Sequence, residues 1–262
     1  MIEIREGIGM MKRAILMGLA LGVVSAANAQ VLFTGSYSQD FNTLASTSAA
    51  NVWTNNVTPL VGWYATRTVY VANNGGNNAG ALYSYGLDAP DPNSSDRALG
   101  SIGSQSTATV FYGVRLVNNS GGSITSLRIR YRGEQWRYSG NATAQTVNFG
   151  FKLGAAAINE AGYSNVAALA FTSPSISGST GTRNGNLAEN SQAFDQTFSV
   201  GSWAAGQELW LRWEDIDHAG ADHGLAVDDL FVTNATPVPE PITMALGIAG
   251  AGVFVRRRLR KA

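Results

Sequence analysis

The feature that most constrains this chain is a strict alternation of apolar and polar residues in two short segments. In the first, Leu127, Ile129 and Tyr131 alternate with three arginines; in the second, apolar residues from Val147 to Leu153 alternate with polar residues or glycine. A period of two places the apolar side chains of each segment on one face of a β-strand. A strand with one apolar face belongs to a sheet packed on one side, so both segments are predicted to cover a core.

The same pattern recurs between residues 31 and 232 as short apolar stretches separated by Asn, Gly and Ser. Asn and Gly tolerate a positive φ angle, which makes these separators turns. No helical period extends over more than about ten residues, so we expect strands throughout. The predicted strands are 31–37, 61–71, 79–85, 108–118, 123–132, 144–153, 166–171, 192–200, 207–213 and 225–233. They predict an all-β fold, a single β-sandwich of the jelly-roll type.

Residues 237–262 differ in composition from everything before them and consist of three successive parts. A proline-rich turn comes first, an uncharged apolar run from 242 to 255 follows, and a basic cluster comes last. Prolines break a helix, an uncharged run favours lipid, and arginines favour the cytoplasmic side. We therefore predict a short hydrophobic helix that inserts into a membrane. The residues that define the turn and the cluster are Pro239, Glu240, Pro241, Arg256, Arg257 and Arg258.

This tail resembles the PEP-CTERM sorting signal of Gram-negative bacteria. The resemblance implies recognition by an exosortase, a membrane cysteine transpeptidase, and cleavage near the Pro-Glu-Pro turn. It also implies a protein that is exported across the inner membrane, anchored until it is processed, and made by a producer of exopolysaccharide or biofilm matrix. The alternative is a permanent anchor. The apolar run has only 14 residues, a helix of about 21 Å against a hydrocarbon core of about 30 Å, which favours the sorting signal.

The amino-terminal segment has the order of a secretory signal peptide. Lys12 and Arg13 precede an apolar run from 14 to 24, and the small residues Ala27 and Ala29 form the pattern of a cleavage site. We predict a signal helix, export by the Sec machinery and cleavage after the second of these alanines. The chain then divides into a signal peptide at 1–29, a β-sandwich domain at 30–236 and the sorting tail at 237–262.

Without these two ends the chain keeps 10 basic and 15 acidic residues, although the complete sequence is balanced at 18 of each. A domain with a net charge near −5 repels nucleic acid, so a nucleic-acid partner is excluded. The sequence contains no cysteine, and packing must therefore stabilise the domain without disulfides.

Several segments also resemble exported bacterial β-domains to which no activity is assigned. The resemblance covers most of residues 60–233 and implies a β-sandwich in an extracellular setting. The segments that carry it are GWYATR (62–67), ALYSYG (81–86), DRALGSIGS (96–104), 112–137 and 208–233.

The richest polar stretch runs from Glu214 to Asp229 and holds six carboxylates in 16 residues. Calcium takes about six to eight oxygen ligands, several of them from carboxylates. An EF-hand is excluded because Ala219 and Ala226 occupy its fifth and twelfth positions. Two readings stay open: a structural calcium site, or a solvated acidic turn whose side chains accept hydrogen bonds from nearby backbone amides. The candidate calcium ligands are Asp215, Asp217, Asp222, Asp228 and Asp229.

The chain offers few catalytic candidates. His218 and His223 are its only histidines, and without cysteine they make an incomplete zinc set, so we expect two exposed loop residues. No G-x-S-x-G nucleophile elbow occurs. Glu134, just after a predicted strand among aromatic residues, is the best isolated candidate for a glycosidase carboxylate. We expect it instead to pair with Arg132 or Arg137 and to hold two strands in register.

Six tryptophans and nine tyrosines offer faces that could stack on sugar rings, although most are expected in the core. Trp210 and Trp213 fall on opposite faces of one strand, so at least one of them is core. We therefore expect an exported, noncatalytic cell-surface or extracellular-matrix protein, with exopolysaccharide as a candidate ligand. The alternatives are an extracellular hydrolase of polysaccharide and a calcium-stabilised structural module.

Overall fold

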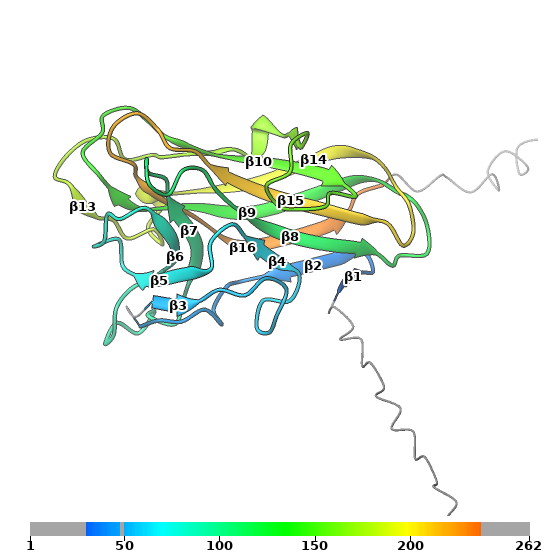
Figure 1. Ribbon diagram of the computed structural model, residues 1–262, viewed down its shortest axis with the longest axis horizontal. Helices are drawn as coiled ribbons and strands as arrows, with labels where there is room; N and C mark the ends of the chain where they lie inside the picture. The colour runs from blue at the N-terminus through cyan, green and yellow to red at the C-terminus, as the bar shows by residue number, and fades with distance from the viewer. Residues whose placement is uncertain (1–29, 48–49, 237–262) are drawn as a thin grey trace, which may run out of the picture.

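Two mixed β-sheets packed against each other form the part of the chain that the structure describes (Figure 1). The computed structural model describes residues 30–47 and 50–236, which contain strands and two short 3-10 helices but no α-helix. The predicted all-β, jelly-roll-like sandwich is confirmed. The predicted terminal helices, in 1–29 and 237–262, lie outside the described residues. Within the described ranges, no helix combines the length and the hydropathy needed to cross a membrane.

The smaller sheet, sheet A, has seven strands. Across the sheet they follow the order β1 (Val31–Phe33), β8 (Val110–Asn118), β15 (Glu208–Asp215), β10 (Thr146–Leu153) and β11 (Ser164–Asn165), with β4 (Trp63–Ala65) beside β8 and β12 (Phe171–Thr172) beside β10. All neighbours are antiparallel except β1 and β8.

The larger sheet, sheet B, has nine strands. Their order is β13 (Gly181–Thr182), β9 (Ile124–Tyr138), β16 (Gly224–Asn234), β7 (Ala98–Ile102), β6 (Ala81–Tyr85), β5 (Val69–Asn73) and β3 (Ala50–Val52), with β14 (Ser191–Trp203) beside β9 and β2 (Ser36–Gln39) beside β16. The longest strand, β9, therefore contacts β14 along one edge and β16 along the other.

Three segments differ from the strands predicted from the sequence. Strand β7 falls outside the predicted strands because all five of its residues are buried, so apolar and polar residues do not alternate. Within the predicted strand 166–171 the chain instead forms a 3-10 helix, Ala167–Leu169, before the two residues of β12. The predicted strand 61–71 is divided between β4 and β5.

The main core lies between the inner faces of the two sheets, with Trp213 near its centre. The Trp213 ring stacks on that of Trp63 at 5.9 Å between centroids and meets Tyr131 and Phe149 edge-on at 5.6 and 5.2 Å. All four side chains are almost completely buried. Aromatic pairs in such geometries contribute beyond the area they bury, which helps a domain without disulfides.

The alternation predicted in the segment 127–132 is confirmed. Leu127, Ile129 and Tyr131 are buried in the main core, whereas Arg128 and Arg130, on the opposite face of β9, are exposed. The outer face of sheet B is therefore open to solvent over the first half of β9.

The other end of the same outer face is covered. Here Trp136 and Ala226 belong to a second buried cluster. Strand β13 pairs with the end of β9 within the sheet, and the residues that follow β13 reach the Trp136 indole. The backbone amide of Arg183 donates to the carbonyl of Trp136 at 2.7 Å. Gly185 is so close to the indole that an added Cβ would lie 2.5 Å from its Nε1.

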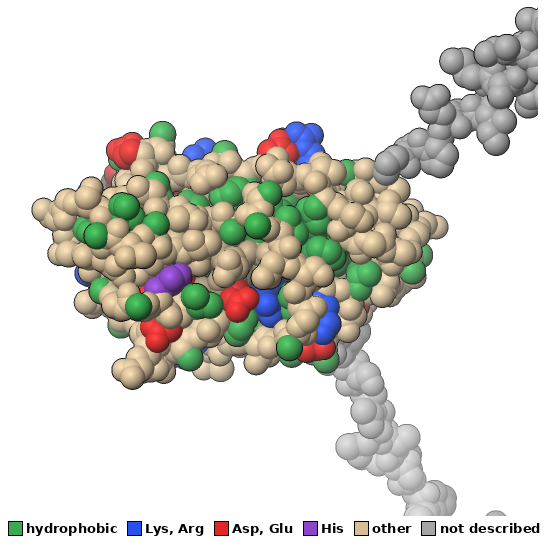
Figure 2. Space-filling view, turned by 90° about the horizontal axis from the view of Figure 1, so that it is seen from above, with side chains coloured by type: hydrophobic (Ala, Val, Ile, Leu, Met, Phe, Trp, Pro, Cys, Tyr) green, Lys and Arg blue, Asp and Glu red, His purple; other side chains and the backbone are tan. Residues whose placement is uncertain are grey.

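Charged side chains are sparse on the surface. On the face seen in Figure 2 they stand in small, separate groups among hydrophobic and uncharged polar side chains. This distribution agrees with a sequence in which 14% of the residues are charged.

Candidate functional site

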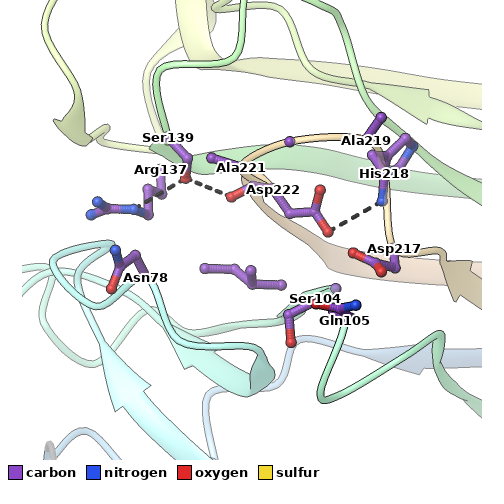
Figure 3. A pocket seen from close by; sticks show the side chains of 13 residues that line it. Asn78, Ser104, Gln105, Arg137, Ser139, Asp217, His218, Ala219, Ala221 and Asp222 are labelled. Atoms are coloured by element: carbon purple, nitrogen blue, oxygen red, sulfur yellow. Dashed lines mark hydrogen bonds between the residues drawn. The ribbon is translucent and has the colours of Figure 1, made fainter.

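A polar pocket of about 440 Å³ opens at one end of the sandwich, beside the loop 216–223 that joins β15 to β16 (Figure 3). The rest of its wall comes from the loop before β6, the end of β7 and the end of β9. Its charged and amide-bearing side chains are Asn78, Gln105, Arg137, Asp217, His218 and Asp222.

Side chains from the connection between β9 and β10 fix the loop 216–223. Gln145 Nε2 donates to Asp222 Oδ1 at 3.3 Å, and Gln145 Oε1 accepts from the backbone amide of His223 at 2.5 Å. Asn141 Nδ2 donates to the carbonyl of Ala219 at 2.8 Å. These bonds hold the loop in one conformation, so this wall of the pocket is formed before any ligand arrives.

Arg137 connects the pocket loop with a second loop. Its Nε donates to Ser139 Oγ at 3.2 Å, and that hydroxyl donates to the carbonyl of Asp222 at 2.5 Å (Figure 3). Its Nη1 donates to the carbonyl of Gly75 at 2.9 Å. The guanidinium therefore serves as a brace, and it also contributes positive charge to the pocket wall.

Two carboxyl groups in this region have raised pKa values. Burial raises the pKa of Asp215 to about 7, although Ser101 Oγ donates to its Oδ2 at 2.6 Å. Burial, with a smaller contribution from the charge of Asp217, raises the pKa of Asp222 to about 6. Asp217 itself is exposed. Carboxyl groups near the pocket can thus donate as well as accept hydrogen bonds close to neutral pH.

The expectation of two exposed loop histidines is wrong. His223 is only 1% exposed and His218 is half-buried. The backbone amide of Ser139 donates to His223 Nδ1, and that of Thr146 donates to His218 Nε2, both at 3.2 Å. Each ring accepts a hydrogen bond with one nitrogen and is therefore neutral, and burial lowers the pKa of both. The residues after β9 cover these rings, which the local sequence could not reveal.

The five candidate calcium ligands do not meet at one place. Asp215, Asp217 and Asp222 lie in or next to the pocket loop. Asp228 and Asp229 lie within β16, and residues 224–227 of that strand separate them from the loop. Over residues 30–47 and 50–236, no group of three or more histidine, aspartate or glutamate side chains is arranged to hold a metal ion. Two of these side chains accept hydrogen bonds from nearby backbone amides: Asp222 from that of His218, and Asp228 from that of Asp229.

Glu134 is not paired with Arg132 or Arg137, contrary to expectation. It is 1% exposed, and its Oε2 accepts a hydrogen bond from Trp136 Nε1 at 2.9 Å. Burial raises the pKa of Glu134 to about 7. Burial, followed by the charge of Glu134, raises the pKa of Asp228 to about 9. Since its side chain is buried, Glu134 is not accessible as a glycosidase carboxylate.

None of the six tryptophans offers an exposed face, because each is at most 6% exposed. Trp213 and Trp210 lie on opposite faces of β15 as predicted, yet both are buried. Trp210 packs on the outer side of sheet A against Tyr64, at 4.6 Å between ring centroids. A stacking platform for sugars cannot therefore be made from tryptophan.

Sequence reasoning located the pocket loop through its carboxylates but missed most of the opposite wall. Those residues come from separate connections, and nothing in their local sequence distinguishes them from ordinary turn residues. The missed residues that line or brace the pocket are Asn78, Gln105, Arg137, Ser139 and Gln145.

No protein-family model matches the chain, and no curated protein matches it either. Among solved structures it is similar to an arabinose-bound α-L-arabinofuranosidase, MgGH51, with a TM-score of 0.36 and 10% identity; the match covers 78% of this chain and 29% of that one. It is also similar to TmCBM61 in complex with β-1,4-galactotriose, with a TM-score of 0.29 and 6% identity; that match covers 68% of this chain and 89% of the other. TM-scores this low say nothing about what this chain binds.

Proposed function

We propose that this chain is an exported, noncatalytic surface or matrix protein that binds a polysaccharide in the pocket beside the loop 216–223. The observation that carries the proposal is the composition of the pocket wall. Amide, carboxyl and guanidinium groups converge on about 440 Å³ of space, and the loop that bears several of them is fixed by hydrogen bonds. Sugar hydroxyls both donate and accept, so they match a wall of mixed polarity.

The pocket is tested by removing exposed polar side chains that the fold does not use. Asn78→Ala, Gln105→Ala and Asp217→Ala change exposed residues of the wall. We expect each to weaken binding to a responsive polysaccharide by about tenfold in calorimetry. Gln196→Ala, at an exposed position of β14, is the matched control and should bind like the wild type. A wild-type protein that binds no member of a polysaccharide panel would end the proposal.

A hydrolase is the second candidate, because one observation favours it. Asp217 and Asp222 both line the pocket, and the pKa of Asp222 is raised to about 6, as a general acid would require. The two functions differ in turnover. Binding without release of new reducing ends supports the noncatalytic protein, whereas release that disappears in Asp222→Asn supports the hydrolase.

Export and sorting are proposed from the two ends of the sequence together with the limits of the fold. The first described strand begins at Val31 and the last ends at Asn234, so removal of 1–29 and 237–262 would leave every described strand in place. Expression in a Gram-negative host with an exosortase should yield a mature protein that starts at Gln30 and lacks the basic cluster. Replacing Pro239, Glu240 and Pro241 with alanine should leave the tail attached. An intact chain in the cytosol of that host would refute export.

A further inference from the structure

We infer that the loop 216–223 is an acid-sensitive latch on the pocket. Protonation of His218 and His223 breaks the hydrogen bonds that tie this loop to residues 139–146, which lead from β9 into β10, and the pocket wall opens. The effect of the opening on binding rests on the proposed function, because it assumes that the pocket holds a ligand. The opening itself is a property of the fold and can be measured without a ligand.

Both histidines accept a backbone amide from residues 139–146. The amide of Thr146 donates to Nε2 of His218, and the amide of Ser139 donates to Nδ1 of His223, each at 3.2 Å. A neutral imidazole has one acceptor nitrogen, so the ring proton occupies the other. That other nitrogen, Nδ1 in His218 and Nε2 in His223, is buried in both rings. The two rings are thus opposite tautomers, and each binds the backbone only while it is neutral.

A second proton on either ring removes its bond to the backbone. The proton would occupy the nitrogen that now accepts, so an N–H group of the imidazolium would point at an N–H group of the backbone. The hydrogen bond becomes a contact between two donors, and the buried charge loses its hydration without gaining an acceptor. The ring must therefore leave residues 139–146, and the loop that carries it moves with it.

The groups around the two rings set the pH at which this happens. Burial is the largest influence, and it lowers the pKa of both histidines. The carboxylate of Asp217 opposes this effect at His218, whereas the charges of His218 and Arg183 add to it at His223. Backbone carbonyl groups oppose it at both rings, and the Tyr138 ring of β9 packs against His223 at 5.2 Å between centroids. The closed loop therefore keeps both rings neutral at a pH at which an exposed histidine, with a pKa of about 6.5, is charged.

Asp222 is the other titratable group that holds the loop. Its Oδ2 accepts from the backbone amide of His218 at 3.3 Å (Figure 3), and its Oδ1 accepts from Gln145 Nε2 at 3.3 Å. Burial raises the pKa of Asp222 to about 6, so acid protonates it as well. A protonated carboxyl group keeps one acceptor oxygen and gains a donor, so it loses at most one of the two bonds. Protonation of a histidine instead turns its bond into repulsion, which makes the histidines the trigger.

The latch acts on the pocket because the loop forms one of its walls. Asp217, His218 and Asp222 line this wall, whereas Asn78 and Arg137 line the pocket from other loops and strands (Figure 3). Release of the loop takes its polar groups away from the opposite wall. A ligand held between the two walls would then lose half of its contacts.

The test measures hydrogen exchange at the backbone amides of Ser139 and Thr146 in the complete chain. The ratio of the intrinsic rate to the measured rate corrects for the effect of pH on the exchange chemistry. Between pH values of about 7 and about 4.5, this ratio should fall at least about tenfold at both amides, because each loses its acceptor. The double change His218→Gln and His223→Asn should keep it within about twofold, because an amide oxygen accepts at the matching position and does not titrate.

Titration of the imidazoles by NMR is the second measurement, and only two histidines are present in the sequence. Both should titrate below a pH of about 6.5, together with the loss of protection. Asp217→Asn should shift the titration of His218 to lower pH, because it removes a negative charge. Arg183→Gln should shift that of His223 to higher pH, because it removes a positive charge. Glu189→Gln, at an exposed position, is the control and should shift neither.

The outcomes separate the latch from the function on which its effect rests. Protection that persists in the wild type at a pH of about 4.5 overturns the latch, and so does an equal fall in the double variant, which would assign the opening to Asp222. If the double variant is unprotected near pH 7, the wild type decides. A loss of protection that follows the histidine titration then supports the latch, and one that is separated from it by more than about one pH unit overturns it. Each failure leaves the pocket proposal standing, whereas a wild type that binds no polysaccharide near pH 7 ends that proposal and leaves the exchange result unchanged.

Discussion

The two halves of β9 carry side chains on the same outer face of sheet B, yet they have opposite environments. In the first half Arg128 and Arg130 are exposed, whereas in the second half Glu134, Trp136 and Tyr138 are buried. The strand is continuous, but its register with β16 shifts between Asp228 and Phe231, where the first half meets the second. The second half is also covered, because Gly185 lies against the Trp136 indole and the Tyr85 ring stacks on it at 6.1 Å.

The chemistry of the acidic groups follows from this difference. In the open half Asp195 meets Arg128 in solvent, and that hydrogen-bonded arginine lowers the pKa of the carboxylate. In the covered half burial raises the pKa of Glu134 to about 7 and that of Asp228 to about 9. Desolvation disfavours the charged form of a carboxyl group, and a facing guanidinium favours it. The same sheet face thus holds one carboxyl group with a lowered pKa and two with raised pKa values.

Trp136→Ala should have the largest effect on the covered half, because the indole contacts Gly185, stacks on the Tyr85 ring and donates a hydrogen bond to Glu134. We expect a loss of about 3 to 5 kcal/mol in the free energy of unfolding, from the cavity and from the hydrogen bond that Glu134 loses. Urea denaturation measures it. A loss below about 1 kcal/mol would show that the segment 181–190 does not depend on this contact.

Alternation predicted the open half of β9 and failed for the covered half. The pattern of Leu127 to Arg132 assigns inner and outer faces correctly because solvent lies on one side. From Gly133 to Trp136 every residue is buried, and Gly185, which lies against Trp136, is about 50 residues away in sequence. No local signal can report such cover, which is why Glu134 was expected in an ion pair.

The candidate site shows the same limit. The carboxylates of the loop 216–223 are visible in the sequence as an acidic stretch, and their neighbourhood is indeed the pocket. Gln145 and Arg137, which hold that loop, are single polar residues in unremarkable contexts, and only the tertiary fold brings them to it. Residues that act through long-range contacts leave no periodic or spaced pattern to detect.

Gly185→Ala tests whether the cover must touch the indole. An added Cβ would lie 2.5 Å from Nε1 and 2.6 Å from Cε2 of Trp136, so the segment or the ring has to move. We expect a loss of about 1 to 3 kcal/mol in thermal or urea unfolding. Gly122→Ala is the control, because a Cβ there would meet no atom within 4 Å. Equal stability of the two variants would mean that the cover adapts freely.

Glu134→Gln and Asp228→Asn test the electrostatic side of the comparison. With pKa values of about 7 and about 9, these groups keep protons in the folded protein that the unfolded chain releases near pH 4. Stability should therefore fall as pH rises from about 5 to about 9. Because Asp215 and Asp222 have raised pKa values as well, the double variant should flatten this fall without abolishing it.

The control for that experiment is Glu189→Gln, which removes one exposed carboxyl group from the covering segment. Melting temperatures across the pH range should follow the wild-type curve in the control. If the control and the double variant flatten the curve equally, net charge rather than burial governs the pH dependence, and the electrostatic contrast between the halves of β9 is wrong.

The smallest effect is expected in the open half, from the double change Arg128→Gln and Asp195→Asn. The two side chains are about half exposed and bonded in bidentate geometry. In the unfolded chain each would bond water about as strongly, so the ion pair contributes little to the free energy of unfolding. The urea midpoint should stay within experimental error of the wild type, and added salt should not change that result. A clear destabilisation would mean that the row of side chains across β14, β9 and β16 also holds the sheet together. The open face would then share the structural role of the covered one.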